Sequence, residues 1–118
     1  FLICPGGMPG AKNLGDCTIL IQMIQKHFDR GGYVAAICAA PALVLSKIKM
    51  NKRYTMTCYP GFEKYLPGGE MQPHGVVVDG NVITGRGPAY AFKFGLAILE
   101  QLTSKSVAEE VAAGMLLD

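Results

Sequence analysis

Short apolar runs alternate with amphipathic stretches along this chain, and the alternation predicts a sheet covered by helices. The apolar runs are uninterrupted, as is typical of strands buried on both faces of a parallel sheet. We predict strands over residues 1–4, 34–37, 53–59, 75–78 and 82–84. The last two flank Asp79-Gly80-Asn81, a turn sequence that strongly indicates a β-hairpin.

Apolar residues at helical spacing predict the helices between these strands. The first helix should begin near Asp16, as its N-cap, and end at Gly31-Gly32. Later helices are expected over 41–49, as one or two turns over 62–66, over 89–102, and from 104–106 onward. Ser106 and Glu109 have the spacing of a capping box at the start of the last one. The 89–102 helix is apolar on nearly every side, so we expect it to be deeply packed.

The order of these elements predicts the fold class. Strands that alternate with helices imply right-handed crossovers and a mostly parallel sheet. We therefore expect an α/β protein, a three-layer α/β/α sandwich with a flavodoxin-like sheet and an added β-hairpin. With 118 residues, the chain is long enough for one domain and too short for two. It opens on Phe1-Leu2-Ile3-Cys4, inside an apolar run and without an initiator methionine, so we expect a fold that is incomplete at its N-terminus.

Cys38 is the candidate reactive residue. It directly follows the apolar run Val34–Ile37, and Pro41 is well placed in the first turn of a helix that follows. A cysteine there lies at the carboxyl end of a strand and the amino end of a helix, where α/β sheets bind ligands and where a thiolate is favoured. This arrangement is a nucleophile elbow built on cysteine. The alternative, judged from the local pattern alone, is a buried cysteine that acts as a small hydrophobe.

Composition narrows the classes of function. Half of the residues are hydrophobic and 17% are charged, which is typical of a globular protein. A net charge of +2 is too small to indicate binding to nucleic acid or to a membrane surface, and no apolar run approaches the roughly 18 residues of a membrane span. The four cysteines show neither a CxxC pair nor zinc-ligand spacing, so we expect reduced thiols, a cytoplasmic protein, and no metal or other cofactor.

Three ordered motifs resemble the ThiJ/PfpI superfamily, whose fold is shared with class I glutamine amidotransferases. They are CPGGMPGAKNL from Cys4, YVAAICAAPALVL from Tyr33 and ITGRGPAYAFKFGLAILEQL from Ile83. The resemblance is greatest to the branch of the Parkinsonism-associated deglycase and its bacterial relatives, some of which are labelled thiazole-biosynthesis proteins. It implies that residues 1–118 are the C-terminal two-thirds of one family domain. It also implies a homodimer, and a preceding segment that supplies a glutamate to the reactive sulfur.

The resemblance assigns roles to individual residues. Cys38 matches the reactive cysteine of the family, and Gly7 and Ala39 match positions whose backbone N–H groups point at the site. Two such donors beside a thiolate form an oxyanion hole. Gly6, in the same PGG motif as Gly7, is a further residue expected to line the site.

The chain also departs from the patterns of its relatives. Ala39 stands where protease-like members have a histidine, and the His-x-Glu pair of amidotransferases is missing. The slot after Gly68-Gly69, a histidine in many deglycase-like relatives, is Glu70, and the His-Pro of some relatives is Tyr59-Pro60.

Three further side chains have two interpretations each. His74 is either a proton shuttle or a solvated residue at the hairpin edge. Glu70 either lines the site or is a surface carboxylate. Cys58 ends a strand expected beside the Cys38 strand, and is either a resolving thiol or an inert core residue.

The leading hypothesis is a glyoxalase III or deglycase-like enzyme. Its Cys38 thiolate would act on α-oxoaldehydes or on their adducts with thiols and amines, without a cofactor. The alternative is a protein of oxidative stress, a redox sensor or redox-regulated chaperone, in which Cys38 is oxidised to a sulfinate. A peptidase or amidase is a weaker alternative. A phosphate-binding module is the weakest, because PGGMPG lacks the fingerprint of a phosphate or dinucleotide loop.

Overall fold

A four-stranded sheet divides the computed structural model into layers. The structure describes residues 1–66, 70–71 and 74–117. The strands are β1 (Leu2–Cys4), β2 (Val34–Ile37), β5 (Val76–Asp79) and β6 (Val82–Gly85), in the spatial order β1-β2-β6-β5. β1, β2 and β6 run parallel, and β5 pairs antiparallel with β6. The expected mostly parallel sheet with a hairpin addition is confirmed.

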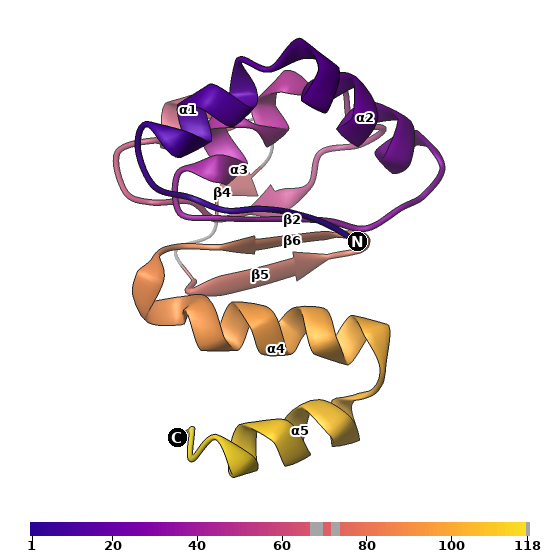
Figure 1. The fold of residues 1–118 in the computed structure, drawn as a ribbon, viewed down its shortest axis with the longest axis vertical. Helices are drawn as coiled ribbons and strands as arrows, with labels where there is room; N and C mark the ends of the chain where they lie inside the picture. The colour runs from indigo at the N-terminus through magenta and orange to yellow at the C-terminus, as the bar shows by residue number, and fades with distance from the viewer. Residues whose placement is uncertain (67–69, 72–73, 118) are drawn as a thin grey trace.

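Helices cover both faces of this sheet (Figure 1). One face carries α1 (Gly10–Gly15), α2 (Thr18–Asp29) and α3 (Ala40–Leu43); the other carries α4 (Ala91–Leu102), with α5 (Lys105–Gly114) outside it. Short 3₁₀ turns span Leu45–Lys47, Glu63–Tyr65 and Pro88–Tyr90. The three-layer α/β/α architecture predicted from the element order is therefore confirmed. No helix in the described ranges is long and apolar enough to cross a membrane.

Alternate residues of the central strands contribute to two separate cores. Val34 and Ala36 of β2 belong to the larger core under α1–α3, whereas Ala35 belongs to the smaller core under α4. Side chains of a strand point alternately to its two faces, so an uninterrupted apolar run fills both cores at once. This is why the pattern of β2 shows no polar alternation.

Two helix starts differ from the predictions. Asp16 does not cap a helix; it ends α1, a helix the sequence analysis missed, and its carboxylate accepts a hydrogen bond from the Lys12 ammonium at 2.7 Å. α2 begins at Thr18. Ser106 is also not a cap, because Ser104 precedes α5 and its hydroxyl accepts a hydrogen bond from the Val107 N–H at 3.2 Å.

The segment 53–59 forms less strand than predicted. Only β3 (Thr55–Met56) is strand, and it pairs in parallel with β4 (Glu70–Met71) in a separate two-stranded sheet. Beyond it, the Thr57 N–H donates to the Thr84 hydroxyl at 3.0 Å. The ladder ends because this N–H bonds to a side chain instead of a neighbouring backbone. The expectation that the Cys58 segment is a strand beside β2 is therefore wrong, since the neighbours of β2 are β1 and β6.

Two predicted helices are also less regular or less buried than expected. The 41–49 stretch is the short α3 followed by the 3₁₀ turn Leu45–Lys47. In α4, Phe94 and Ile98 are buried against the sheet, but Phe92 is 64% exposed and Leu102 is 63% exposed. The prediction that the whole of α4 is deeply packed is therefore wrong, because the sheet and α5 cover only part of its surface.

Candidate active site at Cys38

Cys38 lies in a left-handed backbone conformation at the carboxyl end of β2. Its φ angle is +66°, an angle that costs a residue with a side chain roughly 1–2 kcal/mol. Ala39 then serves as the N-cap of α3, and Pro41 occupies its first turn. The sharp strand-to-helix turn expected of a nucleophile elbow is present.

Backbone hydrogen bonds hold this strained residue on both sides. The Cys38 N–H donates to the Gly85 carbonyl at 2.9 Å, and the Cys38 carbonyl accepts from the Tyr59 N–H at 2.8 Å. The first bond continues the β2–β6 pairing by one residue, and the second ties the elbow to the segment after β3. The surrounding structure therefore fixes the Cys38 backbone in this conformation, as a strained residue requires.

The glycine-rich loop after β1 packs directly against Cys38. A Cβ placed on Gly6 would lie 2.5 Å from the Cys38 Cβ and 3.4 Å from its Sγ. The backbone can approach this closely only because Gly6 has no side chain. Gly6 therefore lines the site, in agreement with its expected position.

The two expected oxyanion donors lie on either side of this contact. Gly7 follows Gly6 and has a φ of +86°, which glycine adopts without strain. Ala39 follows Cys38, is 2% exposed, and as an N-cap has an N–H with no partner inside its helix. Their place in the chain agrees with the expectation, and their role as donors stays a prediction.

Cys58 is near the elbow but is not an activated thiol. It is fully buried, and burial, followed by the negative charge of Glu63, raises its pKa to about 11. The nearby Arg86 acts in the opposite direction. Cys58 is therefore protonated at neutral pH, which favours the inert core residue over the resolving thiol.

The remaining two cysteines differ in their exposure. Cys4 is buried at the end of β1, and burial raises its pKa to about 11. Cys17 is exposed. All four thiols are free, and no cluster of metal-ligating side chains occurs among the described residues.

His74, the candidate proton shuttle, and Glu70, the candidate lining residue, lie near the starts of β5 and β4. His74 is exposed and precedes β5, and it has no hydrogen bond to Cys38 in the described parts of the chain. Glu70 begins β4, but its side chain lies outside what the structure describes. Their roles stay predictions. His27 packs on Gly32 with its Nε2 3.0 Å from the Tyr33 carbonyl oxygen, which gives it a structural contact away from Cys38 in the sequence.

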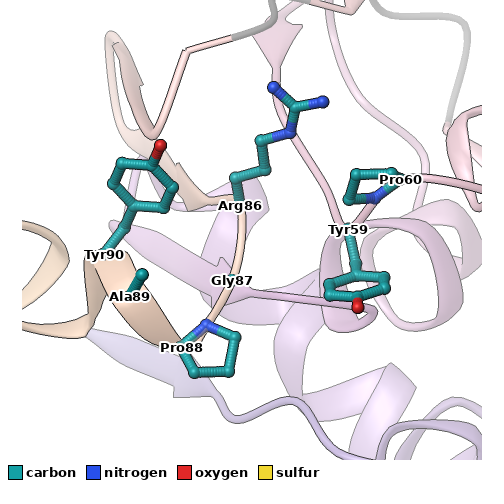
Figure 2. Close-up of a pocket in the computed structure, with 7 residues that line it drawn as sticks. All are labelled: Tyr59, Pro60, Arg86, Gly87, Pro88, Ala89 and Tyr90. Carbon is teal, nitrogen blue, oxygen red and sulfur yellow. The ribbon is translucent and has the colours of Figure 1, made fainter.

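A hollow beside the elbow contains residues that the sequence analysis did not connect with the site. It has a volume of about 260 Å³, and Tyr59, Arg86, Pro88 and Tyr90 are among its lining residues (Figure 2). The sequence analysis noted Tyr59 only as a departure from relatives, and it mentioned residues 86–90 only as part of the third family motif. For 86–88 the available signal was position, because this segment follows β6, which runs parallel to β2 and ends at the same edge of the sheet. Tyr59 follows β3 of the separate sheet, and only the tertiary contact of its N–H with the Cys38 carbonyl places it here.

Comparison with known proteins decides the family. The model of the DJ-1/PfpI family matches residues 1–101. The chain belongs to the DJ-1/PfpI family. This confirms the resemblance that the three motifs indicated.

Individual relatives agree with the family model. Protein dj-1beta of Drosophila melanogaster is 36% identical over 98% of this chain, and its crystal structure superposes with a TM-score of 0.89. The oxidized DJ-1 of Toxoplasma gondii is 35% identical over 95% of the chain, with a TM-score of 0.87 and 61% of that protein covered. The glutathione-independent glyoxalase DJR-1.2 of Caenorhabditis elegans is 36% identical over 86% of the chain and 54% of its own length. The chain spans 63% of the length of the Drosophila protein.

Proposed function

We propose that this DJ-1/PfpI chain carries the nucleophilic part of a cofactor-free glyoxalase or deglycase. The observation that supports this most is the held, left-handed Cys38 at the carboxyl end of β2, packed against Gly6. The glyoxalase relative from Caenorhabditis elegans supports the choice of substrate class.

The proposed reaction begins with addition of the Cys38 thiolate to the aldehyde carbon of an α-oxoaldehyde such as methylglyoxal. A C–S bond forms, and the carbonyl π electrons move to oxygen, where the N–H groups of Gly7 and Ala39 stabilise the charge. The hydrogen on that carbon is then transferred as a proton through an enediol to the neighbouring carbon, leaving a thioester. Water cleaves the C–S bond, releasing lactate and the thiolate, so the net reaction consumes one water and no oxidant. With an adduct as substrate, the amine or thiol leaves and is restored.

The proton transfers need an acid–base group. By family resemblance we propose a glutamate contributed by a companion N-terminal segment, outside residues 1–118. The whole assembly is proposed to be a cytoplasmic homodimer built on one family domain.

The test is lactate formation from methylglyoxal by the protein together with that segment. We expect turnover to fall at least a hundredfold in Cys38→Ala and to be unchanged in Cys17→Ala, because Cys17 is exposed and far along the chain from the elbow. Full turnover by a folded Cys38→Ala variant would exclude the mechanism.

A redox sensor or redox-regulated chaperone is the second candidate, supported by the relative whose structure is that of oxidized DJ-1. In this case mild peroxide adds two oxygens to Cys38 selectively, as mass spectrometry would show, and no carbonyl turnover accompanies it. The peptidase alternative gains no support. Ala39 stands directly after Cys38, where protease-like relatives have a histidine, and no histidine in the described ranges makes a hydrogen bond to Cys38.

A further inference from the structure

The hollow beside Cys38 has two tyrosine walls. Tyr59 and Tyr90 lie on opposite sides of the Arg86–Gly87 backbone, and Pro60 and Pro88 complete the apolar lining (Figure 2). An apolar cavity of about 150 Å³ is enough to bind benzene. A hollow of about 260 Å³ therefore has room for one ring-sized group, but not for a peptide.

Glycines hold both tyrosine rings in place. The Tyr90 ring packs on Gly75, where any Cβ would overlap the ring atoms. The Tyr59 ring packs on Gly87, at 3.6 Å from the position a Cβ would take, and meets the Phe62 ring edge-on with centroids 6.5 Å apart. Walls that are already ordered lose little side-chain entropy when a ligand enters.

The hollow is joined to the nucleophile through the backbone. Cys38 itself does not line it, but the Tyr59 N–H donates to the Cys38 carbonyl. On the other side of Cys38, the Gly85 carbonyl accepts a hydrogen bond from the Cys38 N–H, and Arg86 is the next residue after Gly85. The Arg86 N–H in turn donates to the Gly75 carbonyl under the Tyr90 ring, at 2.9 Å. The Tyr59 wall thus bonds directly to Cys38, whereas the Tyr90 wall is linked to it through Gly75 and the strand end at Gly85.

We propose that this hollow is a specificity pocket for a planar, apolar substituent on the electrophile that Cys38 attacks, with an aryl group as the occupant. Tyrosine rings and a guanidinium plane both stack on aromatic groups, and proline and alanine add apolar contact. This inference rests on the proposed function, and it specifies the substrate class as aryl-substituted α-oxoaldehydes in preference to methyl-substituted ones.

The first experiment does not require turnover. Iodoacetamide and its N-phenyl analogue deliver the same alkylating carbon with and without a ring. The second-order labelling rate at each cysteine is measured by mass spectrometry. Exposed Cys17 serves as the internal reference for the intrinsic reactivity of the two reagents. We expect the phenyl-to-parent rate ratio at Cys38 to exceed that at Cys17 by about threefold to tenfold, the range of one aromatic contact.

Substitutions of the two tyrosines then test whether the hollow causes the phenyl preference at Cys38. Tyr90→Ala, and independently Tyr59→Ala, should bring the Cys38 ratio to within twofold of the Cys17 ratio. Both side chains are partly exposed, at 37% and 46%, so folding should survive their loss. Tyr65→Ala is the matched control, because Tyr65 is an exposed tyrosine that does not line the hollow. It should retain the wild-type ratio.

Three results would overturn the pocket: no phenyl preference at Cys38 in the wild type, a preference that survives both tyrosine substitutions, or no labelling of Cys38 by either reagent. A second assay compares kcat/KM for phenylglyoxal and methylglyoxal. Absence of turnover with both would refute the proposed function, while the alkylation ratios decide the pocket separately. Turnover of both with a ratio insensitive to Tyr59 and Tyr90 would refute the pocket alone.

Discussion

Replacement of Gly6 by alanine tests how the glycine-rich loop supports Cys38. The new Cβ would lie 2.5 Å from the Cys38 Cβ and 2.8 Å from the Ile37 carbonyl oxygen. Ordinary carbon contacts are about 3.5–4.0 Å, so the loop and the elbow must separate by about 1 Å. Both contacts are with the strained elbow or its backbone, and neither atom is the end of a flexible side chain. Overpacking of this kind costs about 1–3 kcal/mol.

Gly10→Ala is the matched control. It makes the same substitution four residues later, at the first residue of α1, where no heavy atom lies within 4 Å of the added Cβ. Alanine there reduces the entropy of the unfolded chain and should stabilise by about 0.4–1 kcal/mol. The two variants should therefore differ by about 1.4–4 kcal/mol in their free energy of unfolding.

Urea denaturation followed by circular dichroism measures this difference, with an unchanged m-value showing that the same surface unfolds. Iodoacetamide labelling of Cys38 supplies a second measurement, and we expect a changed rate in Gly6→Ala and a wild-type rate in Gly10→Ala. The reasoning is refuted if Gly6→Ala is as stable as Gly10→Ala and labels at the wild-type rate.

Three further predictions test other parts of the structure. Phe94→Ala should lower the free energy of unfolding by about 3–5 kcal/mol and Phe92→Ala by less than about 1 kcal/mol, because only Phe94 is buried. Equal losses in urea denaturation would contradict the packing of α4. A hydrogen bond from the Thr55 N–H, and next in size one from the Lys52 ammonium, lower the pKa of Asp79 below 3.8. The stability that the ionised Asp79 contributes is therefore present above pH 3.8 and is lost as the pH falls through the lowered pKa. Asp79→Asn should thus be less stable at pH 6 but not at pH 2, and a pH-independent difference would argue against the hydrogen bonds. Burial raises the pKa of Cys58 from 9.0 to about 11, so the stability that the protonated thiol contributes is complete below pH 9 and is lost as pH rises towards 11. Cys58→Ala should therefore flatten the alkaline decline in the free energy of unfolding. An unchanged slope would show that Cys58 does not cause this decline.

Local sequence was sufficient for the sheet and for the position of the elbow. The apolar runs, the Asp79-Gly80-Asn81 turn and Pro41 each act over a few residues, and the four strands of the main sheet and the start of α3 appear where they predict them. Helix starts were less predictable because several residues at each one could serve as the cap. The Asp16 carboxylate is paired with Lys12, and Ser104 caps α5 in place of Ser106.

Long-range contacts decided what the local pattern left open. The segment after β3 leaves the strand conformation because the Thr84 hydroxyl and the Cys38 carbonyl take its N–H groups, and both partners lie about 20 or more residues away in the chain. Tertiary packing also buries Cys58, and this burial is the main cause of its raised pKa.

By itself, the sequence determined the fold class and the family, and it singled out Cys38 as the candidate reactive residue, since apolar periodicity and short motifs depend on neighbouring residues. Only the tertiary structure showed that Cys38 has a left-handed backbone held by Gly85 and Tyr59, and that Tyr59 and Tyr90 face one hollow. Those arrangements join residues from separate loops at one edge of the sheet. Their geometry depends on how the strands align, which the spacing of residues along the chain does not specify.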